Sequence, residues 1–327
     1  MENHRKPTAS LSLDLDNKWS YMKTHGDAGW ESYPSYLNVV VPRFIDFLAA
    51  RDLKITVFVV GQDAALERNH DALQLIPEHG HEVGNHSFHH EPWLHLYSEE
   101  KIDEEFARTE EALLFATGET PVGFRGPGFS LSPDVLKVLQ RRGYKYDCST
   151  FPTFLGPLAR MYYFMTAKLD PEEKEERKKL FGTFSEGFKT LRPYLWNLEG
   201  GPLLEIPVTT MPCFKVPIHV SYLLYLDQFS RTLAMTYWRM ALTMCRLTGV
   251  GPSLLLHPLD FMGADDDSDL AFFPAMSGGH ERKVELVGRV IDLMTSYYRV
   301  VPMREHAVEA AARLGHSLVD QPDFVEV

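Results

Sequence analysis

The stretch LSLDLDNKW, Leu11 to Trp19, alternates apolar with polar residues and places two aspartates, Asp14 and Asp16, two positions apart. Alternation at period two predicts a β-strand, in which residues i and i+2 point to the same face. Two carboxylates side by side on a buried strand are costly unless a cation, an arginine or a proton compensates their charge. We therefore expect the first strand to present Asp14 and Asp16 to a partner elsewhere in the chain.

Short apolar runs alternate with longer helix-like segments over most of the 327 residues. The predicted strands are Leu11–Asp16, Ile55–Val60, Glu82–His86, Gly123–Arg125, Tyr144–Ser149, Leu203–Val208 and Ser253–His257. The predicted helices cover residues 34–51, 63–79, 98–117, 132–142 and 281–297. This alternation is typical of βαβ units and a parallel sheet, either a barrel or a doubly wound sheet.

Most of the predicted strands end in a polar or charged residue, and in α/β barrels the carboxyl ends of the strands build the active site. These residues are Asp16, His86, Arg125, Asp147 and His257. We therefore search for function at this edge of the sheet.

Composition excludes several classes of protein. A net charge of −12 argues against binding of nucleic acid or of anionic membranes, since both need a basic surface. The three cysteines are too few and too widely spaced for a disulfide framework or a thiolate metal site. The polar N-terminus, with no apolar run long enough to span a membrane, gives the expectation of a cytoplasmic protein without a transmembrane segment.

The densest cluster of histidines is HEVGNHSFHH, residues 81–90. His86 and His90 are four apart, a spacing that predicts two imidazoles on one face of a helical turn. Two histidines and one carboxylate form a metal site with positions open to water or substrate. His89 is a competing ligand, whereas His81 is expected to be an ordinary surface residue.

Two further stretches complete the candidate site. In VGFRGPGFS, residues 122–130, a strand ends in Arg125 and is followed by a rigid Gly-Pro-Gly turn with backbone N–H groups available. Arg125 is expected at the same end of the sheet as Asp14, where its guanidinium would stabilise that carboxylate. In GPSLLLHPLD, residues 251–260, His257 follows an apolar strand and is a candidate general acid.

Taken in order, these residues resemble the polysaccharide deacetylase family, also known as the NodB-homology or carbohydrate esterase family 4 group. The family has an acidic pair on its first strand, a His-[Ser/Thr]-x-x-x-His motif, an Arg-x-Pro turn, an Asp-containing strand and a late Leu-x-His strand. The matching segments here are Asp14–Asp16, His86–His90, Arg125–Pro127, Asp147 and Leu255–His257. The resemblance covers about residues 10–150 and 200–260.

The resemblance implies a distorted (β/α) barrel of about seven parallel strands with extra helices. It also implies that the protein hydrolyses an amide-linked acyl group, by deacetylation or deformylation, on a sugar or glycoconjugate that is free or lipid-linked. By this likeness Asp16, His86 and His90 bind a divalent transition metal, expected to be Zn²⁺.

The same likeness assigns the catalytic roles. Asp14 would be the base that takes a proton from the water on the metal, and Arg125 would orient Asp14. His257 would protonate the leaving amine while Asp147 steadies His257. The backbone N–H of Gly128 would help to hold the oxyanion.

Two segments lie outside the resemblance, and we expect one domain over residues 1–327 with helical insertions there. Residues 154–200 hold an aromatic piece, Met161–Met165, and a charge run, Asp170–Lys179; residues 219–248 read as a long aromatic helix. Extra helices packed on the barrel and a lid or apolar groove beside the site are both compatible with this composition.

Three alternatives use the same residues differently. The Asp-x-Asp pair is also typical of haloacid-dehalogenase-like phosphatases, in which Asp14 would be the nucleophile, magnesium the metal, and the acidic run Gly263–Leu270 the late motif. The phosphatase would leave the histidine and arginine motifs unused. A glycosyltransferase would use the pair to hold a nucleotide-bound cation. This alternative is disfavoured because the sequence has no glycine loop that would bind a nucleotide. A non-catalytic glycan-binding relative is the third alternative.

Overall fold

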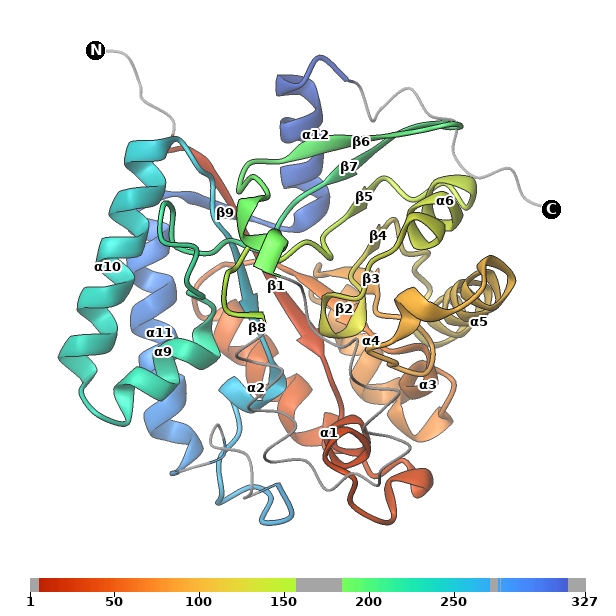
Figure 1. The fold of residues 1–327 in the computed structure, drawn as a ribbon. Helices are drawn as coiled ribbons and strands as arrows, with labels where there is room; N and C mark the ends of the chain where they lie inside the picture. The colour runs from red at the N-terminus through yellow and green to blue at the C-terminus, as the bar shows by residue number, and fades with distance from the viewer. Residues whose placement is uncertain (1–5, 157–183, 271–275, 277, 317–327) are drawn as a thin grey trace.

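The computed structural model of the chain describes residues 6–156, 184–270, 276 and 278–316 (Figure 1). Both Met161–Met165 and Asp170–Lys179 lie outside the described residues. The strands are β1 (Thr8–Leu15), β2 (Thr56–Val59), β3 (Glu82–Asn85), β4 (Gly123–Phe124), β5 (Tyr146–Asp147), β6 (Tyr194–Leu198), β7 (Gly201–Glu205), β8 (Ser253–Leu256) and β9 (Arg299–Val301). The α-helices are α1 (Lys18–His25), α2 (Leu37–Ala49), α3 (Gly61–Ala64), α4 (His70–Glu78), α5 (Glu99–Thr117), α6 (Pro133–Arg141), α9 (Val220–Asp227), α10 (Arg231–Thr248), α11 (His280–Tyr297) and α12 (Met303–Arg313).

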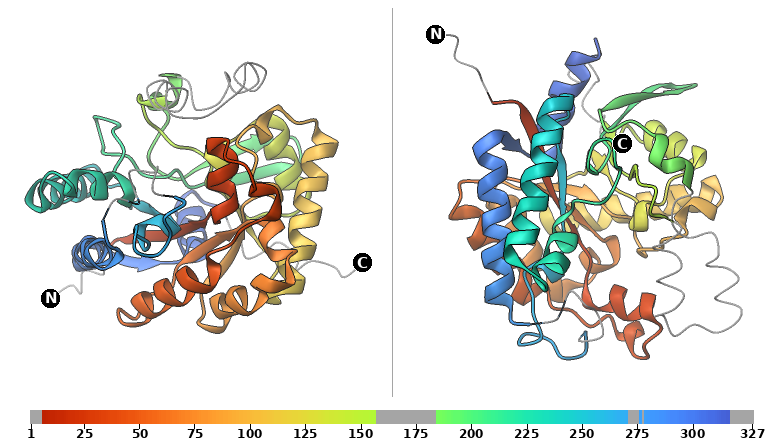
Figure 2. Two further views of the ribbon diagram at one scale, coloured as in Figure 1. Left: turned by 90° about the horizontal axis from the view of Figure 1, so that it is seen from below. Right: turned by 60° about the vertical axis from the view of Figure 1, so that its left-hand side comes forward.

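The strands form one curled sheet in the order β6-β7-β5-β4-β3-β2-β1-β8, with β9 paired to β1. Only the β6–β7 pair is antiparallel, so the path from β7 to β8 is parallel throughout. Beyond β7, the backbone N–H of Thr209 donates to the carbonyl of Ser253 over 3.1 Å, which draws the two ends of the parallel path together. The predicted (β/α) barrel of about seven parallel strands is confirmed, and helices surround it (Figure 2).

The alternation of β1 separates two environments. Leu11, Leu13 and Leu15 pack in the main hydrophobic core with residues of α2 such as Phe44. The intervening residues face the inside of the barrel, where Ser12 bonds to a side chain of a distant strand. The apolar face therefore anchors β1 to the helices, and the polar face supplies the groups that line the interior.

All seven strands predicted from sequence occur, with ends that differ from the prediction by at most three residues. The short helix α1 was not predicted, because its sequence has little amphipathic pattern. It is defined instead by its ends: the Asn17 side chain accepts from the N–H of Lys18 over 2.8 Å, and Gly26 closes the helix with φ 86°. In Figure 1 this helix lies at the carboxyl end of β1.

The amino end of the barrel is closed by α12, which was also not predicted. Met303 and Ala307 of α12 pack in one cluster with Phe58 and Tyr146 from the strands. Figure 1 shows α12 on the side of the sheet opposite α1. One end of the barrel is thus filled by packing, and the other carries the candidate site.

Gly84 tests how tightly the strands pack beneath the site. A Cβ built on Gly84 would lie 2.5 Å from the ring of Phe58, and Arg125 lies over that ring at 4.7 Å. We expect Gly84→Ala to lower the free energy of unfolding by about 1–3 kcal/mol, because a buried ring must shift. Urea unfolding followed by circular dichroism measures this change.

Gly279→Ala is the matched control for that measurement. Gly279 has φ −76°, and its nearest neighbour to an added Cβ lies at an ordinary 3.4 Å. We expect this variant to unfold like the wild type. Equal stability of the Gly84 and Gly279 variants would contradict the packing described here.

Candidate active site

The parallel register brings the predicted residues to one edge of the sheet. Leu13 of β1 pairs with Leu256 of β8, so Asp14 is level with His257. Asn85 of β3 pairs with Phe124 of β4, so the next residues along these strands are also level. The carboxyl ends of five strands thus supply the site, as in other α/β barrels.

Asp16 and the two predicted histidines converge on one point. The Oδ1 atom of Asp16 lies 3.3 Å from Nε2 of His86 and 3.0 Å from Nε2 of His90. The helical turn predicted here from the spacing of the histidines is wrong. Residues 86–90 form a loop in which Ser87 and His90 have φ of 59° and 53°. Two left-handed residues, rather than helical periodicity, bring the imidazoles together.

The donor atoms of this cluster fit a divalent cation. Nδ1 of His86 lies 2.7 Å from the carbonyl of Arg125, which fixes the ring and leaves Nε2 to face Asp16. Within the described residues, Oδ1 of Asp16 is buried and makes no hydrogen bond, which leaves it available to a cation. Burial alone would raise the pKa of Asp16, but His90 and His86 outweigh it and hold the pKa well below its usual value. Two imidazoles and one carboxylate are a donor set typical of zinc.

His89 is not part of this cluster. Its ring pairs with the carboxylate of Glu105, and the other oxygen of Glu105 accepts from the N–H groups of Phe88 and His89, each over 3.0 Å. Glu105 is buried on α5, so this carboxylate ties the loop to the helix layer. The competing ligand therefore has a different partner.

Asp14 is paired with Arg125, as the sequence predicted. Nη1 of Arg125 lies 3.0 Å from Oδ1 of Asp14 and also 3.0 Å from Oγ of Ser12. Nε donates to the carbonyl of Cys148 over 3.1 Å. The guanidinium is fully buried; burial would lower its pKa, but the charge of Asp14 raises it above the ordinary value. Arg125 thus holds the carboxylate of Asp14 in a fixed position.

Asp147 has different partners from those expected. One of its oxygens accepts from Oγ of Ser149 over 2.6 Å, and its carboxyl group also contacts Glu205, which the sequence analysis did not single out. Burial raises the pKa of Asp147, and burial together with Asp147 raises that of Glu205 well above its usual value. Two buried carboxyl groups in contact share a proton rather than both ionising.

His257 is contacted from another direction. Its Nδ1 lies 3.4 Å from Oγ of Ser221, and its backbone N–H donates to Asp260 over 2.8 Å. The structure therefore does not place Asp147 as the residue that steadies His257. Asp147 occupies β5, accepts a hydrogen bond from Ser149 and has its carboxyl group beside Glu205.

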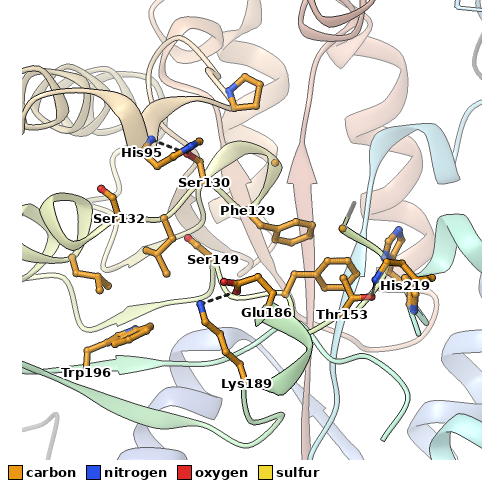
Figure 3. Close-up of a pocket in the computed structure, with 18 of the residues that line it drawn as sticks. His95, Phe129, Ser130, Ser132, Ser149, Thr153, Glu186, Lys189, Trp196 and His219 are labelled. Carbon is orange, nitrogen blue, oxygen red and sulfur yellow. Dashed lines mark hydrogen bonds and ion pairs between the residues drawn. The ribbon is translucent and has the colours of Figure 1, made fainter. Parts of the chain in front are cut away.

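A pocket of about 550 Å³ adjoins this edge of the barrel (Figure 3). Gly128, with φ 58°, lines it, and within the described residues its N–H donates no backbone hydrogen bond. Figure 3 shows His219 and Trp196 at opposite ends, with an ion pair of Glu186 and Lys189 between them over 2.7 Å. Most residues that line the pocket lie outside the histidine and arginine motifs, so those motifs did not predict the pocket.

The acidic run near residue 265 has basic partners. Arg43 binds Asp266 through two bonds of 2.7 Å, and Lys18 binds Asp267 and Asp269. Asp265, Asp266 and His280 form a second group whose atoms lie close enough to hold an ion. Its carboxylates are already engaged, so these contacts give no support to the phosphatase alternative.

The polysaccharide deacetylase family matches residues 26–146 of the chain. This segment holds the histidine loop and the Arg125 turn. Among curated relatives, a peptidoglycan deacetylase of Helicobacter pylori is 27% identical over 147 residues, which are 43% of this chain and 48% of the relative. A peptidoglycan deacetylase-like protein of Gibberella zeae is 30% identical over 171 residues, 50% of this chain and 48% of the relative. The chain thus spans about half the length of these curated relatives.

Two solved structures have a similar fold. A Mycobacterium smegmatis protein assigned to the polysaccharide deacetylases has a TM-score of 0.64 at 19% identity, covering 99% of this chain and 97% of its own. A Puue allantoinase has a TM-score of 0.56 at 17% identity, covering 95% and 92%. Among the helices of the described residues, none is both long and apolar enough to cross a bilayer.

The metal site can be tested by zinc content. We expect purified protein to bind zinc near 1:1, because the ligand atoms of Asp16, His86 and His90 lie within 4.8 Å of one another. His86→Ala should lower zinc affinity more than about 100-fold, since even groups that only orient a ligand are worth 10–100-fold. Elemental analysis and competition with a chromogenic chelator measure both quantities.

His89→Ala is the control, because His89 lies in the same loop but pairs with Glu105. This variant should keep stoichiometric zinc. Loss of zinc in the His89 variant, with zinc retained in the His86 variant, would contradict the ligand assignment.

Proposed function

We propose that the protein is a metal-dependent deacetylase that hydrolyses an amide-linked acetyl group on a sugar. The single observation that carries this proposal is the convergence of Asp16, His86 and His90 next to an aspartate that a buried arginine holds. A relative named as a peptidoglycan deacetylase supports the choice of acetyl and sugar. Deformylation of a related sugar uses the same chemistry and is the alternative reaction.

The metal would be held by Asp16, His86 and His90, and zinc is the species that this donor set favours. Such a metal lowers the pKa of a water and polarises a carbonyl, which makes amide hydrolysis feasible at neutral pH. The two aspartates of β1 therefore have separate tasks. Asp16 completes the cation site, and Asp14 remains available for proton transfer.

Asp14 is the proposed general base. Arg125 binds one oxygen of Asp14 over 3.0 Å and orients the carboxylate, which would take the proton of the attacking water. The N–H of Gly128 is the proposed donor to the developing oxyanion. His257 stands level with Asp14 on the neighbouring strand β8 and would protonate the leaving amine, which is otherwise a poor leaving group.

The pocket is the proposed site of the sugar. Phe129 and Phe151 stack with their ring centroids 4.5 Å apart, and aromatic faces of this kind pack against the apolar faces of sugar rings. Its volume of about 550 Å³ is within the range of small-molecule sites. The ion pair of Glu186 and Lys189 offers polar contacts to hydroxyl groups. A lipid-linked sugar would extend its carrier beyond this pocket.

Asp14→Asn tests the division of tasks within β1. We expect this variant to keep its zinc and to lose at least about 100-fold in kcat, because the amide cannot accept the proton. Release of acetate from N-acetylated, N-formylated and lipid-linked sugars, measured beside zinc content, checks this.

Loss of zinc in Asp14→Asn would reverse the roles of Asp14 and Asp16. A wild-type protein that binds zinc but hydrolyses none of these substrates would favour the non-catalytic, glycan-binding alternative. Magnesium-dependent phosphatase turnover would favour the haloacid-dehalogenase alternative.

Phe151→Ala tests the pocket. We expect KM to rise about tenfold with kcat little changed, because a stacking surface worth about 1.4 kcal/mol is removed away from the reacting atoms. Steady-state kinetics on the best substrate measures both constants. Phe115→Ala is the control: Phe115 is 80% exposed on α5 and does not line the pocket. An equal KM in the two variants would contradict the assignment of the pocket.

A further inference from the structure

His257 is flanked by a hydroxyl and a buried carboxylate that no sequence motif indicated. Nδ1 of His257 lies 3.4 Å from Oγ of Ser221, the second residue of α9. The same hydroxyl donates to Oδ1 of Asp260 over 2.9 Å. The second oxygen of Asp260 accepts from the backbone N–H of His257 over 2.8 Å. Both oxygens of one carboxylate are therefore directed at His257, one of them through Ser221.

We propose that Ser221 and Asp260 are the positioning residues of His257, in place of Asp147. The chain His257–Ser221–Asp260 places the serine between the imidazole and the carboxylate. When His257 carries both ring protons, Nδ1–H can donate to Ser221, whose own proton is directed at Asp260. This orientation leaves Nε2–H free to protonate a leaving amine, which is the arrangement that an acid at this position needs. The inference rests on the proposed function, since it concerns the acid of that reaction.

Asp260 is held in place by contacts around it. It is fully buried, and burial raises its pKa above the ordinary value, although His257, Ser221 and Lys283 act in the opposite direction. Lys283 of α11 donates to the carbonyls of Leu259 and Met262. These two bonds fix the turn that carries Asp260 and so keep its carboxyl group beside Ser221 and the backbone of His257.

The other titratable groups around His257 do not replace Asp260. His219, at the start of α9, has its ring centroid 5.9 Å from that of His257. Burial and then the charge of His257 lower the pKa of His219 to about 3, so His219 stays neutral where the enzyme would work. Asp14 is level with His257 but is bonded to Arg125. Asp147 is bonded to Ser149 and in contact with Glu205.

The test follows the ring protons of His257 in the zinc-loaded protein. Nuclear magnetic resonance of ring-labelled histidine, assigned with His257→Gln, gives the pH at which His257 loses its proton. Asp260→Asn and Ser221→Ala should each lower that pH by about one unit, because a charge or its relay is removed. Ser221→Thr keeps the hydroxyl and should restore the wild-type value. Asp147→Asn should change the pH at which His257 loses its proton by less than about 0.3 unit, because Asp147 contacts Ser149 and Glu205 instead.

The basic limb of the kcat–pH profile should move with the ring protons in each variant. The proposal is overturned if Asp147→Asn shifts the pH at which His257 loses its proton and Asp260→Asn does not. It is also overturned if Ser221→Ala leaves that pH unchanged. If Asp260→Asn does not fold, the Ser221→Ala and Ser221→Thr pair still decides. The magnetic resonance measurement needs no enzyme turnover. An inactive wild-type protein would therefore refute the proposed function, while the ring protons of His257 would still test the roles of Ser221 and Asp260.

Discussion

Arg125 is a full positive charge inside the barrel, and the candidate site depends on how that charge is satisfied. Its guanidinium contacts Asp14 and Ser12 on β1 and the carbonyl of Cys148 beyond β5. Its own carbonyl accepts from the His86 ring. A buried charge without partners costs several kcal/mol, so these strands can close only when the arginine and its acceptors are in place. One residue thereby fixes both the base and one ligand of the cation site.

The same constraint explains why β1 is polar on one face. Ser12 and Asp14 face Arg125, and Ser10 bonds to His306 over 2.8 Å nearer the amino end of the barrel. The leucines between them pack against the helices. A strand with an apolar interior face would leave the arginine without acceptors. The polar residues of β1 therefore line the inside of the barrel and also supply Asp14 to the candidate site.

Much of this could be predicted from sequence, because it depends on local patterns. Period-two alternation predicted β1, and strand ends with polar residues predicted the edge at which Asp14, Arg125 and His257 meet. The histidine loop was predicted with the right members but the wrong backbone. The loop has left-handed residues at Ser87 and His90, and its Phe88 and His89 N–H groups donate to Glu105 of α5, a contact with a distant helix that the local pattern does not contain.

The rest depends on contacts between segments far apart in the chain. Glu205 and Asp260 are single acidic residues without a motif, and only the folded sheet brings them to Asp147 and His257. The predicted link from Asp147 to His257 followed the family pattern, whereas the hydrogen bonds of both residues run elsewhere. The strands β6 and β9 were not predicted: β6 pairs antiparallel with β7 at one edge of the sheet, and the three-residue β9 pairs with the amino end of β1.

The position of the bound metal tests the central claim most directly. Anomalous scattering from crystals of the zinc-loaded protein should show one peak bounded by Asp16, His86 and His90, at distances near 2.0–2.2 Å from their ligand atoms. Asp14 should remain bonded to Arg125 in the same crystals. A peak at Asp265, Asp266 and His280 instead, or Asp14 among the ligands, would contradict the account.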